Sequence, residues 1–171
     1  SAKELCELEA DAYAIGGLAV GEPKDEMLKT VEWMDEFLPR ENPRYLMGVG
    51  TPADLVESVS RGVDMFDCVM PTRNARNGQL FTFDGKINMR NAKFKTDFSP
   101  IDENGFSPMS ETYTKAYLHQ LFKTEEILGY RIATQHNLRF YIYLMNTMQE
   151  EIQNGNFKSW AKDFLARYSN S

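Results

Sequence analysis

Asp67 is the residue whose type and position best suit a chemical role. It interrupts an apolar run, residues 65–70, that is typical of a buried strand, and it lies near the carboxyl end of that run, just before Pro71. Carboxylates on buried strands are costly, so they are usually paired or functional. In barrels of alternating strands and helices, catalytic residues lie at the carboxyl ends of the strands. Two interpretations remain open: a catalytic carboxylate, or a structural one that caps a loop or pairs with Arg73 or Arg76.

Two glycine-containing loops could bind a ligand through the backbone. Gly16 and Gly17 follow an apolar run, and glycine lets the backbone approach a flat ligand closely. Gly48 and Gly50 lead into a predicted helix that begins at Pro52, and the free N–H groups of a helix N-terminus favour an anion such as phosphate. For each loop, an ordinary turn is the alternative interpretation.

The histidines and cysteines are too few for a metal centre of several thiols. His119 and His136 are the only histidines, and each fits a hydrogen-bonded packing role. Cys6 and Cys68 are the only cysteines, which excludes a disulfide framework and a multi-cysteine zinc site. We interpret Cys68 as a small core residue, because it alternates with Asp67 along the same strand. The low cysteine content favours a reducing, cytoplasmic setting.

The first 70 residues predict a parallel sheet that positions these groups. Apolar runs at 13–18, 45–49 and 65–70 predict three strands, with helices that begin near Pro23 and Pro52 between them. Such alternation is typical of parallel strands joined by right-handed crossovers. The strands are apolar almost throughout, so both faces of the sheet should be covered. No glycine-rich dinucleotide or P-loop motif is present, which disfavours nucleotide-cofactor folds.

The second half of the chain changes in character. Residues 80–83 and 86–89 flank Asp84-Gly85, a two-residue hairpin signal. An irregular stretch follows to about Ser110. Apolar residues at helical spacing then predict three helices, over 113–129, 137–154 and 157–168.

Composition and charge limit the class of protein. The chain has 171 residues, of which 42% are hydrophobic and 26% charged, as expected of one soluble globular domain. No apolar run approaches the roughly 20 residues of a membrane span, and the charged N-terminus SAKELCELEADAY does not resemble a secretory signal. The net charge is −6, yet residues 71–95 carry six basic side chains against Asp84 alone. This basic segment is either a local footprint for an anionic partner or a solvated loop.

Five segments together carry a resemblance to one family. They are FDCVMPTRNARNG at 66–78, AIGGLAVGE at 14–22, YLMGVG at 45–50, INMRNA at 87–92 and KAYLH at 115–119. The chain closely resembles the bacterial tRNA-guanine transglycosylases, also called queuine tRNA-ribosyltransferases. The resemblance implies an α/β fold that is the C-terminal part of a (β/α)8 TIM barrel. About three βα units, an inserted β-hairpin in a former zinc subdomain, and C-terminal helices would make up this part. The implied division is 1–79 for the partial barrel, 80–136 for the hairpin and degenerate zinc region, and 137–171 for the C-terminal helices.

The resemblance also implies a reaction. Such enzymes exchange guanine at the tRNA wobble position for a 7-deazaguanine, the queuosine precursor. Asp67 matches the nucleophile, which forms a covalent intermediate with the ribose. Gly17 and Leu18 match backbone that contacts the base, with Glu22 close behind, and Met47 matches an apolar platform. The implied contacts to the tRNA anticodon loop are Gly48, Val49, Gly50, Thr51, Pro52, Ala53, Asp54, Thr72, Arg73, Asn74, Ala75 and Arg76.

Two departures from the family pattern bear on activity. The resemblance begins near the sixth barrel strand, so the first half, with its acid/base aspartate, is absent from the match. The family binds one structural zinc through three cysteines and a histidine, but Gly105, Ser107 and Ser110 stand at the cysteine positions and His136 alone remains. We therefore expect no bound metal and no cofactor, because a structural zinc takes four ligands.

Three hypotheses follow for the isolated chain. It is half of a transglycosylase that is inactive without the other half, or a non-catalytic metal-free half-barrel that self-associates, or a tRNA-binding module without turnover. Open strand edges favour pairing with another chain, either a second copy or the missing half. Tyr113 and Tyr117 match the surface through which the family dimerises.

Overall fold

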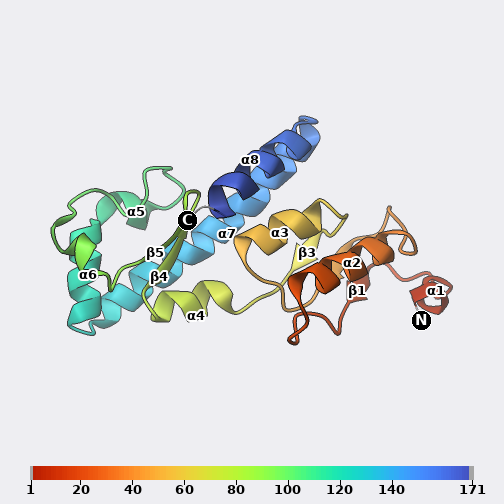
Figure 1. The fold of residues 1–171 in the computed structure, drawn as a ribbon, viewed down its shortest axis with the longest axis horizontal. Coiled ribbons are helices and arrows are strands. Elements are labelled where there is room, and N and C mark those ends of the chain that lie inside the picture. The colour runs from red at the N-terminus through yellow and green to blue at the C-terminus, as the bar shows by residue number, and fades with distance from the viewer. Residues whose placement is uncertain (1, 170–171) are drawn as a thin grey trace. The chain divides into compact units, whose positions relative to one another are not determined.

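The computed structural model describes residues 2–169 (Figure 1). The chain forms two compact units, Ser1–Val69 and Met70–Ser171, called unit 1 and unit 2 below. The three-segment division with boundaries after residues 79 and 136 stays a prediction. Among the described residues, no helix is both long and apolar enough to cross a membrane.

Unit 1 alternates strands with helices. Its elements are α1 (Ala2–Cys6), β1 (Tyr13–Ile15), α2 (Lys24–Asp35), β2 (Arg44–Leu46), α3 (Pro52–Val59) and β3 (Met65–Phe66). The strands form one parallel sheet in the order β1-β2-β3, with Ile15 opposite Leu46 and Leu46 opposite Phe66. The predicted α/β class with a parallel sheet is confirmed, although each strand is shorter than predicted.

One face of this sheet forms the core of unit 1. Tyr13, Ile15 and Leu46 pack in a cluster with Met27 and Val31 of α2. The other face is open, since Ala14 and Met65 are exposed and the side chain between them in register, Tyr45, is only half-buried. The prediction that both faces are covered is wrong for these residues, because burial alternates along each strand.

Helix starts in unit 1 follow local chemistry. Thr51 caps α3: its hydroxyl accepts the Asp54 N–H while the Asp54 carboxylate accepts the Thr51 N–H. The cap and proline predicted from Thr51-Pro52 are therefore confirmed. The predicted third strand is wrong beyond Phe66, because a helix begins at Met70. Pro71 in the first turn of that helix has a preset backbone angle and lacks an N–H that would have no partner there.

Unit 2 is mainly helical. It contains α4 (Met70–Arg76), β4 (Gln79–Thr82), β5 (Gly85–Asn88), the 3-10 helix η1 (Ala92–Thr96), α5 (Pro108–Thr112), α6 (Lys115–Lys123), α7 (Ile127–Gln153) and α8 (Phe157–Ser169). The strands β4 and β5 pair as the predicted antiparallel hairpin. Thr82 pairs with Gly85, so the turn residues are Phe83 and Asp84 rather than Asp84 and Gly85. The side chain of Thr82 fixes this turn, because its hydroxyl accepts the Asp84 N–H and donates to the Gly85 carbonyl.

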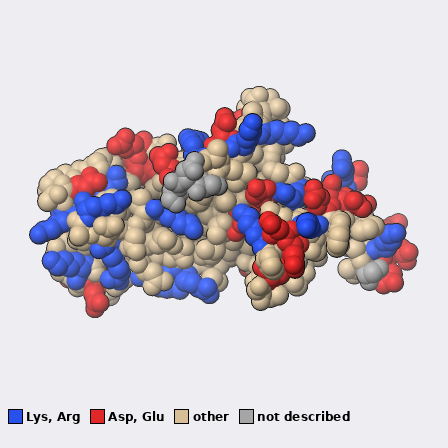
Figure 2. Space-filling view, viewed as in Figure 1, with Lys and Arg blue, Asp and Glu red and all other residues tan. Residues whose placement is uncertain are grey.

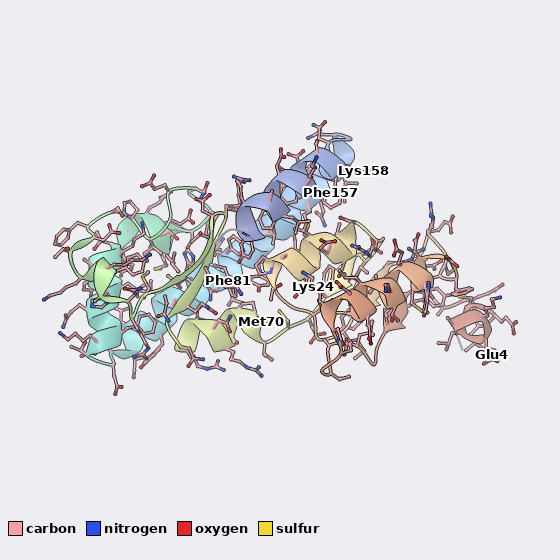
Figure 3. The ribbon with its side chains drawn as sticks, in the orientation of Figure 1. Glu4, Lys24, Met70, Phe81, Phe157 and Lys158 are labelled. Carbon is pink, nitrogen blue, oxygen red and sulfur yellow. The ribbon has the colours of Figure 1, made fainter. Side chains whose placement is uncertain are left out.

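Helix α7 begins ten residues before the predicted start at 137. Gly129, predicted near the end of the preceding helix, lies in the first turn of α7. A side chain there would meet Cβ of Leu121 at 3.0 Å, so glycine lets α6 and α7 pack closely. Farther along α7, the buried ring of Phe140 packs against Phe81 of β4, labelled in Figure 3.

Candidate active site

The carboxylate of Asp67 follows β3 directly and is held by the neighbouring strand. Its Oδ1 accepts a hydrogen bond from the Tyr45 hydroxyl at 2.6 Å and from the Gly48 N–H at 2.9 Å. Both bonds go to Oδ1, so neither engages Oδ2. Asp67 itself is exposed. The arrangement therefore presents an oriented carboxylate at the carboxyl end of a parallel strand.

These contacts keep Asp67 ionised. The Tyr45 hydrogen bond and then the Gly48 N–H lower the pKa of Asp67, because both stabilise the carboxylate. The same hydrogen bond raises the pKa of Tyr45, since the neutral phenol is the donor. An exposed, ionised carboxylate with one oxygen fixed is suited to nucleophilic attack or to stabilising a cationic carbon.

The glycine loop after β1 lies close to Met47, which directly follows β2. A Cβ added at Gly16 would lie 3.4 Å from Sδ of Met47, at about van der Waals contact, and Met47 is 45% exposed. Gly17 has a φ of +76°, which favours glycine. The structure thus places the predicted platform residue Met47 beside Gly16, which precedes the predicted base-contacting residues Gly17 and Leu18, and Leu18 is half-buried.

Glu22 closes the same loop. Its carboxylate accepts the Ala19 N–H at 2.5 Å through Oε1 and the Val20 N–H at 3.0 Å through Oε2. The pKa of Glu22 is lowered, chiefly by the Ala19 N–H. Residue 19 has a φ of +59° although it is not glycine. Glu22 therefore stabilises the backbone conformation of the loop through its carboxylate.

The predicted RNA-contacting segment 48–54 is mostly part of the fold. Gly48 is exposed, whereas Val49, Gly50 and Pro52 are buried and Thr51, Ala53 and Asp54 are half-buried. Lys24, labelled in Figure 3, forms an ion pair with Asp54 at 2.8 Å. Burial opposes ionisation of Asp54, but Lys24 and Thr51 outweigh it, so the pKa is lowered. RNA contact by this segment stays a prediction.

The second predicted RNA-contacting segment, 72–76, belongs to α4 in unit 2. Arg73 and Arg76 are exposed, and the fully buried Ala75 lies between them in the core. Asn74 donates to the side-chain oxygen of Gln79 at 2.8 Å, and Thr72 is half-buried. The two arginines are thus the members of this segment that are free to meet a large anion, while Ala75 anchors the helix.

The positions that correspond to the family's zinc ligands are only partly brought together. Nδ1 of His136 lies 2.8 Å from the Ser110 hydroxyl, and its Nε2 lies 2.8 Å from the Phe81 carbonyl oxygen. Since a carbonyl only accepts, Nε2 carries the proton and Nδ1 accepts from Ser110. Burial lowers the pKa of His136 and keeps it neutral. The Ser107 hydroxyl is buried without a hydrogen-bond partner in the described region.

This donor set does not fit a zinc ion. Neither a serine hydroxyl nor Gly105, which has no side-chain donor, replaces a thiolate, and the free lone pair of His136 is already used by Ser110. Within residues 2–169, no group of three or more His, Cys, Asp or Glu side chains is placed to hold a metal ion.

Comparison with known proteins shows what the chain is similar to. It matches the family model for queuine tRNA-ribosyltransferase over residues 1–170. The chain belongs to the queuine tRNA-ribosyltransferase family. Enzymes of that name from Francisella tularensis subsp. novicida (strain U112) and subsp. tularensis (strain WY96-3418) are each 53% identical to it over 168 residues. A third, from subsp. mediasiatica (strain FSC147), is 52% identical over 168 residues.

The match covers 98% of this chain but only 46% of each of these relatives. The chain therefore spans about half the length of the curated family members that it matches. The resemblance to the C-terminal half of a queuine tRNA-ribosyltransferase is confirmed.

One residue of the candidate site escaped the sequence analysis. The sequence places Tyr45 in an apolar run and assigns it no role, although its hydroxyl makes the shorter of the two hydrogen bonds to Asp67. Its position between the buried Arg44 and Leu46 is the available signal, because alternate residues of a strand point to opposite faces. Finding it required the register between β2 and β3, which places Tyr45 opposite Met65.

Proposed function

We propose that this chain is the nucleophile-bearing half of a tRNA-guanine transglycosylase, built as part of a (β/α)8 barrel. The observation that carries the proposal is the exposed Asp67 carboxylate, with Oδ1 held by Tyr45 and Gly48 and the pKa lowered. Family membership supports it, and so does the position of Asp67 after a parallel strand. The hairpin β4-β5 would be an insertion in the barrel, followed by C-terminal helices.

The proposed chemistry has two displacements. Oδ2 of Asp67 attacks C1′ of the wobble ribose, the C1′–N9 bond breaks, and its electron pair leaves with guanine, which takes up a proton. N9 of the incoming 7-deazaguanine then attacks C1′ and loses its proton, while the bond from C1′ to Asp67 breaks and restores the carboxylate. Two inversions retain the configuration, as in retaining glycosidases. Tyr45 positions Asp67 without contacting the substrate.

The same proposal assigns the binding roles. The backbone at Gly17 and Leu18, closed by Glu22, would contact the base, and Met47 would form the platform beside it. Arg73 and Arg76 would contact the anticodon loop, whose target base must leave its stack to reach Asp67. By the family resemblance, the proton for the departing guanine comes from an aspartate of the other half. The isolated chain would then lack turnover, and a cytoplasmic location would follow from its tRNA substrate.

An exchange assay tests this proposal. The chain is co-expressed with the N-terminal half of one of the Francisella relatives, and incorporation of labelled guanine into tRNA is measured. We expect exchange with the parent chain, and loss of both exchange and the covalent RNA adduct with Asp67→Asn. Asp11→Asn, an exposed aspartate elsewhere in unit 1, is the matched control and should retain activity. Exchange in Asp67→Asn, or none from parent halves that co-purify, would contradict the proposal.

A second candidate is a non-catalytic, self-associating unit. An apolar groove of about 530 Å³ lies beside β1 in unit 1. Its lining includes Leu5, Leu8 and Ala14. In unit 2, the rings of Tyr113 and Tyr117 stack with their centroids 5.5 Å apart, and Tyr117 is 42% exposed. Both features favour association with another chain. Sedimentation that gives only a monomer at micromolar concentration would argue against this candidate.

A third candidate is a tRNA-binding module without turnover, supported by the exposed Arg73 and Arg76. A filter-binding titration against salt separates it from the second candidate. Specific RNA binding should weaken steeply as salt rises, because phosphate contacts release counterions. Binding that is absent at low salt would exclude the module.

A further inference from the structure

Unit 2 contains a pocket that the transglycosylase proposal does not use. It has a volume of about 470 Å³ and lies between the η1 segment and the end of α6. Its lining includes Arg90, Lys95, His119, Phe122, Lys123 and Glu125. Figure 2 shows Lys and Arg side chains gathered over the end of unit 2 that carries α6. Three cations against one carboxylate give the pocket a net positive charge.

Within residues 2–169, none of the three cations forms an ion pair with a carboxylate. Ion pairs in the described region involve other cations, and Arg90, Lys95 and Lys123 are in none of them. All three side chains are exposed. The Arg90 guanidinium lies over the Phe122 ring, 5.4 Å from its centroid. Stacking on a buried ring restricts the guanidinium and leaves its in-plane N–H groups for an external acceptor.

His119 adds a polar ring nitrogen to the same pocket. The side chain is 9% exposed, and its Nδ1 lies 2.7 Å from the Met89 carbonyl oxygen. The carbonyl can only accept, so Nδ1 carries a proton. Nε2 has no hydrogen-bond partner in the described part of the chain. Nε2 is open to the pocket and can accept a hydrogen bond from a ligand, because the proton of the neutral ring is on Nδ1.

We propose that this pocket binds backbone phosphates of an RNA at a point separate from the wobble nucleotide. Arg90 supplies a planar fork that suits a phosphate, and Lys95 and Lys123 supply the further charge. Nε2 of His119 pairs with a polar group of the nucleotide whose phosphate is bound in the pocket. The basic segment found in the sequence thus contributes two separate anion-binding surfaces: the arginines of α4 and the Arg90 and Lys95 side of this pocket. The inference rests on the proposed function for the identity of the RNA.

The test uses the full chain and an RNA hairpin with the sequence of a tRNA anticodon stem-loop. Affinity is measured by fluorescence anisotropy over a range of salt concentrations. We expect K95Q/K123Q to weaken binding on the order of tenfold and to lower the salt slope by about 1 to 2. K158Q/K162Q is the matched control, because it removes two exposed lysines of α8 and changes the net charge equally. Equal losses in both variants, or no loss in K95Q/K123Q, would overturn the proposal.

Two further arms separate this proposal from its alternatives. Inorganic phosphate alone, at constant ionic strength, should bind the parent far more weakly than the hairpin does; if it binds with comparable affinity and K95Q/K123Q abolishes that binding, the pocket is a small-anion site and RNA is the wrong ligand. Hairpins with guanine or uracil at the wobble position should depend equally on the pocket, because phosphates carry no base identity. A chain that ignores the wobble base but loses affinity in K95Q/K123Q would contradict the transglycosylase proposal and support the pocket.

Discussion

The Tyr45 hydroxyl donates a 2.6 Å hydrogen bond to Oδ1 of Asp67, from strand β2 to the residue that follows β3. The Gly48 N–H, just past the end of β2, donates to the same oxygen. The orientation of Asp67 is therefore set by the adjacent strand and its loop. A substitution in β2 should therefore alter the pKa and the orientation of the Asp67 carboxylate, although Asp67 itself is unchanged.

Tyr45→Phe tests this dependence. Loss of the hydroxyl removes the largest stabilisation of the carboxylate, so the pKa of Asp67 should rise toward its ordinary value. A carbon-13 NMR titration of the Asp67 carboxyl measures the shift. In the complemented enzyme, guanine exchange should fall on the order of tenfold, because the nucleophile loses its fixed orientation. Tyr143→Phe, which removes the hydroxyl of a 43% exposed tyrosine in unit 2, should change neither quantity. An unchanged Asp67 titration in Tyr45→Phe would refute the dependence.

Sequence could predict the parts of this site that depend on near neighbours. Thr51-Pro52 specifies a helix start through contacts within three residues, and the structure has that capping box. Tyr45 is different, because its role depends on strand register across 22 positions. The start of α7 also eluded prediction: Gly129 is a poor helix former, and only its close packing on Leu121 explains its place inside a helix.

Asn137→Ala should destabilise unit 2. The buried Asn137 amide donates to the carbonyls of Pro71 and Gln79, and its oxygen accepts the Phe81 N–H. It thereby connects α7 to α4 and β4. Truncation removes three hydrogen bonds to backbone groups, so the free energy of unfolding should fall by about 3 kcal/mol or more. Urea denaturation measures it, and Asn146→Ala on the exposed face of α7 should stay within about 0.5 kcal/mol of the parent.

His136 should make stability fall in mild acid. Burial lowers its pKa, so the folded chain resists a proton that the unfolded chain takes up below about pH 6.5. A lowered histidine pKa gives stability that is complete above the unfolded value and decreases as pH falls below it. The free energy of unfolding should drop by up to about 1.4 kcal/mol per pH unit from this residue. Urea midpoints on either side of pH 6.5 measure the total change.

NMR tests whether the loss of stability in mild acid comes from His136. The His136 ring signals should stay those of the neutral form, with the proton on Nε2, at pH values where a peptide histidine is half-protonated. Ser110→Ala removes the hydrogen bond to Nδ1 but leaves the ring buried, so this behaviour should persist. A His136 ring that titrates near the ordinary value would contradict the prediction.

Restoring the three thiols should create a zinc site. In G105C/S107C/S110C, the lone pair of His136 Nδ1 would be released from the Ser110 hydroxyl and become the fourth ligand. Three thiolates and one imidazole are a common structural zinc set. We expect one zinc per chain by elemental analysis and a higher unfolding temperature with metal. The parent, which has one usual ligand among these four positions, should bind none.

The backbone conformation of Gly105 determines the control for the zinc experiment. Its φ is +68°, so any side chain there costs about 1–2 kcal/mol without metal. S107C/S110C avoids that cost but offers only three donors with His136, so it should bind zinc more weakly than the triple variant. Added His136→Gln should abolish binding in the triple variant if the histidine is a ligand. A triple variant with no more zinc than the parent would mean that the segment 105–110 does not fold as the family's zinc loop does.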